Sequence, residues 1–142
     1  MAYATQQNCI DRYGQNAVIV ATDRDLDGAI DTAVLTNALA DADSTINGYV
    51  GGLPGFPFAP VPDIFETLAV DIALYKAAAP AGVATEEQRK RYDDALKFLS
   101  LVGQGKVRLA TDDGQDIVSH HATAEISSDT RRFSRETMDR LL

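Results

Sequence analysis

The sequence predicts a mainly α-helical protein: a small bundle of about four helices with a long loop, a possible short β-hairpin and an extended C-terminal arm. Apolar residues recur at spacings of three and four in several stretches, and residues that favour helix starts precede them. With 142 residues, 45% of them hydrophobic, the chain can bury one core. We expect a helical domain over residues 1–109 and the hairpin and arm over residues 110–142.

The chain begins with signals for a short helix. Thr5 is suited to the N-cap, and Gly14 can adopt the left-handed conformation that ends a helix about two turns later. The apolar run at 17–21 is too short to distinguish a strand from a further helical turn, and we favour the helix.

The next stretch carries the clearest helical pattern of the first half, and Asp27 or Asp31 is placed to cap it. It should end near Gly48. The apolar residues on its stripe are Ile30, Val34, Ala38, Leu39, Ala42, Ile46, Tyr49 and Val50.

Glycine and proline dominate residues 51–60 and exclude a regular element there. Two interpretations of Phe56 and Phe58 follow. They either pin a connecting loop to the core, or the loop offers them to a neighbouring subunit.

Two further helices are well marked. Pro62 is suited to a first helical position and Asp63 favours the helix start, so we expect a helix to about Ala79. Thr85 and Gln88 form a capping box that opens the last helix, which should stop at Gly103 or Gly105.

The end of the chain changes character. Residues 107–109 and 117–118 flank an Asp-Asp-Gly turn in the manner of a hairpin. The apolar residues of the final stretch, Phe133, Met138, Leu141 and Leu142, have no evident core position. We interpret this stretch as an arm that orders on a partner; simple disorder and a terminal helix on its own subunit are the alternatives.

The charge of the chain is unevenly distributed. The net charge is −8, and because residues 131–142 carry four arginines against two acids (+2), residues 1–130 sum to −10. Such a body repels a phosphate backbone, which argues against sequence-specific DNA binding. The charge suits a channel through which DNA slides, and an acidic surface kept only for solubility fits equally well. We see neither an apolar run that could span a membrane nor a signal peptide, and expect a soluble protein made in the cytoplasm, with its single cysteine, Cys9, buried.

One acidic motif resembles a calcium-binding loop. Asp23, Asp25, Asp27 and Asp31 occupy loop positions one, three, five and nine, but position twelve, which should supply a bidentate carboxylate, is Val34. We favour a turn followed by an N-cap, and a calcium-binding module is the rival interpretation.

No constellation indicates catalysis. His120 and His121 are adjacent and lack the spacing of a zinc site, and Ser119 does not lie in a nucleophile elbow. Paired carboxylates such as Asp93-Asp94 fall on a helix face that we expect to be solvated. We therefore expect no enzyme, catalytic residue, cofactor or metal.

Several passages, in this order along the chain, resemble the Mu-like prophage and phage family of small head-to-tail connector proteins (head-completion adaptors), a family of domains of unknown function. The likeness covers roughly residues 1–109 and again 132–135. The passages are Met1 to Thr5 with Asp11 to Gly14; Thr22 to Arg24, Gly28 to Asp31 and Ala38 to Ala42; then Pro62, Leu68, Asp71 to Ala73, Tyr75, Thr85 to Glu87, Arg89, Arg91-Tyr92 and Ala95-Leu96.

The resemblance implies a structural subunit of the virion, located at the head-to-tail junction. Copies of the chain, twelve in number, would form a ring beneath the portal protein, extend the DNA channel without binding specific sequences, and meet a tail completion or tail terminator protein. We expect Phe56 and Phe58 near one interface and an arm bearing Arg131, Arg132, Phe133, Met138 and Leu142 at another. A tail-side completion protein and a helical domain that binds some other protein are the remaining alternatives.

Overall fold

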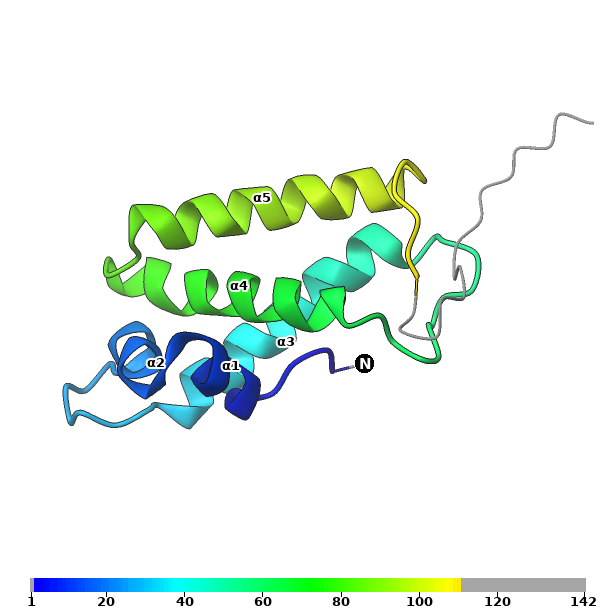
Figure 1. Ribbon diagram of the computed structural model, residues 1–142. Helices are drawn as coiled ribbons and strands as arrows, with labels where there is room; N and C mark the ends of the chain where they lie inside the picture. Colours follow the sequence, from blue (N-terminus) through cyan, green and yellow to red (C-terminus); the bar gives the residue numbers. More distant parts are fainter. Residues whose placement is uncertain (1, 111–142) are drawn as a thin grey trace, which may run out of the picture.

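The computed structural model describes residues 2–110, and within that range it is a bundle of five α-helices without a β-strand (Figure 1). This confirms the mainly helical fold. The helices are α1 (Gln6–Tyr13), α2 (Gln15–Thr22), α3 (Thr32–Val50), α4 (Ile64–Ala78) and α5 (Glu86–Gly103), with a short 3₁₀ turn, η1 (Ala79–Ala81), between the last two.

The first two helices are separated by a single residue. Thr5 caps α1 through a capping box, in which the Asn8 amide donates to the Thr5 hydroxyl oxygen at 3.4 Å and the Asn8 side chain accepts from the Thr5 amide at 2.8 Å. Gly14, at φ 84°, then ends α1 and starts α2. The run at 17–21 is helical, as the sequence favoured.

Helix α3 begins where the sequence places its cap. The Asp31 carboxylate accepts from the amides of Ala33 and Val34 at 3.0 and 3.2 Å, which satisfies donors that have no partner inside the helix. The helix continues through Gly48 and ends two residues later, at Val50.

Helix α4 forms the centre of the bundle. It contacts α1, α2, α3 and α5, and Figure 1 shows it lying between α5 on one side and the two N-terminal helices on the other. Its buried side chains, which include Phe65, Ile72 and Leu74, therefore lie around most of the helix. The helix begins at Ile64, so the expectation that Pro62 opens it is wrong: Asp63 is the N-cap and Pro62 ends the preceding loop.

Helix α5 lies on the outside of the bundle. Its capping box is as predicted, with the Gln88 amide donating to the Thr85 hydroxyl at 3.1 Å and the Gln88 side chain accepting from the Thr85 amide at 3.0 Å. It ends at Gly103, where a Cβ atom would lie 2.8 Å from the carbonyl oxygen of Tyr49. Glycine at this position lets the ends of α3 and α5 approach each other.

The chain after α5 bears on two predictions. Residues 107–109 form no strand, and the second arm of the predicted hairpin, at 117–118, lies outside the described residues. Leu109 is nevertheless buried against the core. Among residues 2–110, no helix has the length and apolar character needed to cross a membrane.

Candidate functional site

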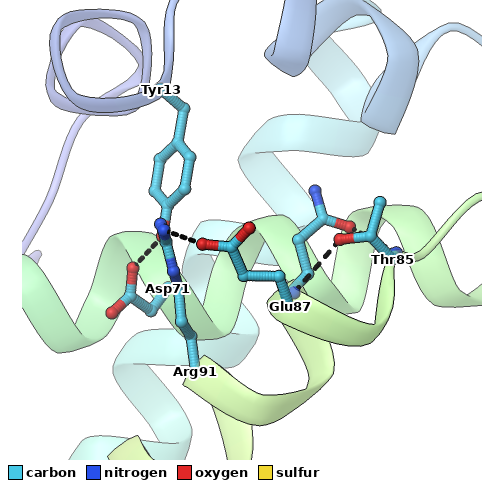
Figure 2. Close-up of polar contacts among 6 residues, drawn as sticks. Tyr13, Asp71, Thr85, Glu87 and Arg91 are labelled. Carbon is cyan, nitrogen blue, oxygen red and sulfur yellow. Dashed lines mark hydrogen bonds and ion pairs between the residues drawn. The ribbon is translucent and has the colours of Figure 1, made fainter.

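A polar cluster joins three helices that are distant in the sequence. The Tyr13 hydroxyl at the end of α1 donates to the Asp71 carboxylate on α4, and the Arg91 guanidinium on α5 lies 5.1 Å from the centre of the Tyr13 ring (Figure 2). Arg91 also forms an ion pair with Glu87, one turn earlier on its own helix. The cluster thus fixes the position of α1 against both α4 and α5.

Burial and charge adjust the titration of this cluster. Burial is the largest influence on Tyr13 and, with the bond to Asp71, raises the pKa of its hydroxyl, which Arg91 lowers in part. Contact with Tyr13, and then with Glu87, raises the pKa of Arg91. The tyrosine therefore stays neutral and the arginine charged throughout the physiological range, as a fixed structural contact requires.

A shallow pocket of about 160 Å³ opens beside the cluster, at the start of α5. Tyr13, Thr85, Glu87, Gln88 and Arg91 line it. The hydroxyl of Thr85 is occupied by the capping box, and Glu87 and Arg91 neutralise each other, as Figure 2 shows. These groups hold helices in place, and the arrangement provides no activated nucleophile among them.

The acidic loop is held together by its own backbone. The Asp23 carboxylate accepts from the amides of Leu26 (2.7 Å), Asp27 (3.2 Å) and Gly28 (2.9 Å). Burial alone would raise the pKa of Asp23, but these backbone hydrogen bonds, with one to Asp25, lower it below the usual value.

Carboxylate oxygens of Asp23, Asp25 and Asp27 come within 4.8 Å of one another, while Asp31 is engaged as the cap of α3. The favoured turn and N-cap are both present. Calcium binding by this loop remains the rival interpretation, and position twelve, Val34, is a partly buried residue within α3 that offers no side-chain oxygen.

The long loop between α3 and α4 is fixed by aromatic contacts. Phe58 is fully buried and stacks on Phe65 of α4 with ring centres 5.7 Å apart, and Phe56 meets Phe58 edge-on at 5.8 Å. Both rings therefore pin the loop to the core, the first of the two interpretations. Their role at an interface stays a prediction, and it would have to use Phe56, because the chain's own residues cover Phe58.

The remaining predicted interface residues, Arg131, Arg132, Phe133, Met138 and Leu142, lie outside the described residues. The Tyr13 cluster and the stacked pair of Tyr75 and Tyr92, with ring centres 4.5 Å apart, were not predicted. Tyr13, Asp71, Glu87 and Arg91 all lie in passages that carry the family resemblance, but nothing in their spacing along the sequence indicates that they meet.

Comparison with known proteins places this chain in a family of phage proteins. Residues 3–128 match the family model described as Bacteriophage Mu, Gp36. The chain is 29% identical over 135 residues to the Mu-like prophage FluMu protein gp36 of Haemophilus influenzae, covering 95% of this chain and 94% of the relative. It is also 29% identical over 146 residues to Gene product J of Escherichia phage Mu, covering 96% of each chain. Since the family model matches most of the chain, the protein belongs to the Bacteriophage Mu Gp36 family of Mu-like phage proteins.

Proposed function

We propose that the chain is a non-enzymatic structural subunit of the head-to-tail connector of a tailed double-stranded DNA bacteriophage. In this role it binds the portal protein, extends the DNA channel and provides the docking surface for the tail. The observation that carries the proposal is the match of residues 3–128 to a phage Mu family, together with the resemblance of the same passages to head-completion adaptors.

The polar side chains of the described residues mainly hold the fold together, which supports a structural role for the protein. Tyr13, Asp71 and Arg91 connect helices, Asp31 caps a helix and Asp23 folds a loop. Each of these groups has a structural partner, which suits a protein whose task is to keep a shape under load.

The charge supports passage of DNA through an assembled ring. The whole chain carries −8, and a lumen lined by negative charge repels the phosphate backbone instead of retaining it. We propose that twelve copies surround the channel, the number that the family resemblance implies.

The C-terminal arm is proposed as the attachment to the portal or to a neighbouring copy. Residues 131–142 carry four arginines and the apolar residues Phe133, Met138 and Leu142, whereas residues 1–130 sum to −10. A basic and apolar segment is complementary to an acidic protein surface.

The direct test uses DNA-filled heads of the same phage that lack this protein. Electron microscopy before and after addition of the purified chain should reveal a new ring at the portal vertex, and added tails should then join. Heads that stay bare while the protein binds purified tails would contradict the connector role and support a tail-side completion protein.

Deletion of residues 125–142 tests the arm separately. We expect the truncated chain to keep its helical circular dichroism spectrum and to lose attachment to heads. Undiminished formation of infectious particles by this variant would refute the arm while leaving the connector role intact.

A further inference from the structure

The large apolar side chains that the described surface exposes gather at the two ends of the bundle. One end, here called the tip, is where α2 and α4 finish and α5 starts; the other, the base, is where α3 and α5 finish and α4 starts (Figure 1). The tip exposes Val20, Leu26 and Val83, and the base exposes Tyr49, Ile64 and Leu101.

The outer face of α5, which lies between the two ends, is charged instead of apolar. The outer face of α5 alternates acids and bases, with ion pairs between Arg91 and Glu87 and between Lys97 and Asp94. Such a face is well solvated and has little to gain from contact with another protein.

At the tip, the backbone holds a leucine outward. Leu26 is 87% exposed and adopts φ 61°, a conformation that residues other than glycine rarely take. The three backbone amides bound by the Asp23 carboxylate fix the loop in this shape. An apolar side chain presented on a preformed loop loses little freedom when a partner covers it.

At the base, the apolar side chains stand on rigid helix ends. The close approach of Gly103 to the Tyr49 carbonyl brings the last turns of α3 and α5 together, and Tyr49 and Leu101, which are 39% and 41% exposed, lie on these turns.

The loop at the tip and the segment that leaves the base also carry opposite charge. The tip loop, residues 23–31, contains four aspartates and one arginine, a balance of −3. The segment that leaves the base, residues 104–110, carries Lys106 and Arg108, a balance of +2. Opposite potentials on two surfaces favour their encounter and disfavour contact of either surface with itself.

We propose that the tip of one copy docks on the base of the next, so that Leu26 lies against Tyr49 and Leu101 and the acidic loop faces Lys106. Two different patches on one chain make a head-to-tail contact, which closes into a ring when the rotation between neighbours fits. This inference deepens the proposed function by naming the contact that builds its ring.

Disulfide trapping with the full chain tests the contact. The double variant Leu26→Cys with Leu101→Cys, oxidised in solution and after addition to connector-deficient heads, should give a ladder of covalent dimers, trimers and larger species that collapses on reduction. Each single variant should remain monomeric, and an equal mixture of the two should stop at the dimer. The native Cys9 is fully buried and burial raises the pKa of its thiol to about 11, so it does not compete in the oxidation.

The results separate this inference from the connector role. Dimers from Leu26→Cys alone would mean that tip meets tip, and a double variant that joins heads without forming a ladder would show a different contact; either result overturns the inference and leaves the connector intact. A ladder in solution from a protein that never joins heads would support the contact and contradict the connector.

Charge-reversal variants that contain no added cysteine provide an independent test of the same contact. The pair Asp25→Lys with Asp27→Lys should weaken association at least tenfold in sedimentation experiments at low salt, and Lys106→Glu in the same chain should restore most of the loss. Association that is unchanged by either replacement would overturn the contact, provided that circular dichroism shows the same helix content in all variants.

Discussion

Helices α4 and α5 are neighbours of similar length with opposite surroundings. Nine of the fifteen residues of α4 are buried, compared with three of the eighteen residues of α5. Helix α4 is covered by other helices on nearly every side. Helix α5 packs on the bundle through one narrow apolar stripe, and its charged face is exposed to solvent. The free energy of folding is therefore concentrated on α4, and α5 can change its outer face at little cost.

Paired truncations on the two helices test this difference most strongly. Leu74→Ala on α4 removes a fully buried side chain and should cost about 2–5 kcal/mol, whereas Leu96→Ala, partly exposed on α5, should cost below about 1.5 kcal/mol. Urea denaturation of both variants measures the two values. Equal losses would show that α5 contributes to the core as much as α4 does.

The glycine that brings α5 against α3 gives the next largest effect. Gly103→Ala would place a Cβ 2.8 Å from the Tyr49 carbonyl oxygen and should destabilise the fold by about 1–3 kcal/mol. Gly48→Ala is the matched control, because it meets nothing within 4 Å inside α3 and should stabilise by up to about 1 kcal/mol. Thermal unfolding monitored by circular dichroism should move the two midpoints in opposite directions.

The start of α5 depends on its cap more than on its exposed charges. Thr85→Ala removes the hydroxyl that accepts from the Gln88 amide and should cost about 1 kcal/mol. Thr85→Ser keeps the hydroxyl and should remain close to the wild type. Faster amide hydrogen exchange confined to the first turn of α5 would locate the loss, and a serine variant as unstable as the alanine variant would refute the capping account.

The contact between α1 and the two long helices gives the smallest effect. Tyr13→Phe removes the bond to Asp71 and should cost about 0.5–1.5 kcal/mol at pH 7. Because the folded pKa of Tyr13 is raised, the unfolded chain ionises first, and stability falls as the pH rises above about 10. The variant should show a shallower fall in alkaline denaturation; a residual slope is expected because Tyr3, Tyr92 and Cys9 also have raised pKa values.

Most of the helices could be predicted from signals between residues close together in the sequence. Contacts between distant residues could not be predicted from such signals. Thr5, Asp31 and Thr85 act within a few residues of themselves, so their caps could be predicted from spacing alone. The bond between Tyr13 and Asp71 spans 58 positions and depends on how the helices pack. The same limit applies to Phe58, whose burial is decided by its stacking on Phe65 of α4 and not by its own proline-rich surroundings.

The acidic loop shows how one motif can have two meanings. Its aspartates are spaced as in a calcium site, yet the same oxygens accept from the backbone amides that fold the turn and start α3. Spacing predicts which atoms are available as ligands, and only the folded loop shows that Asp23 and Asp31 already have partners.

Gly14 places a bend between the eight residues of α1 and the eight residues of α2. Its φ of 84° and ψ of 152° interrupt what would otherwise be one continuous helix. Tyr3, which precedes α1, is bound to α3: its hydroxyl donates to Asn47 at 2.6 Å and its amide donates to Asp43 at 3.0 Å. A bend at a residue without a side chain therefore sets the direction of α1, and with it the direction from which the N-terminal residues reach α3.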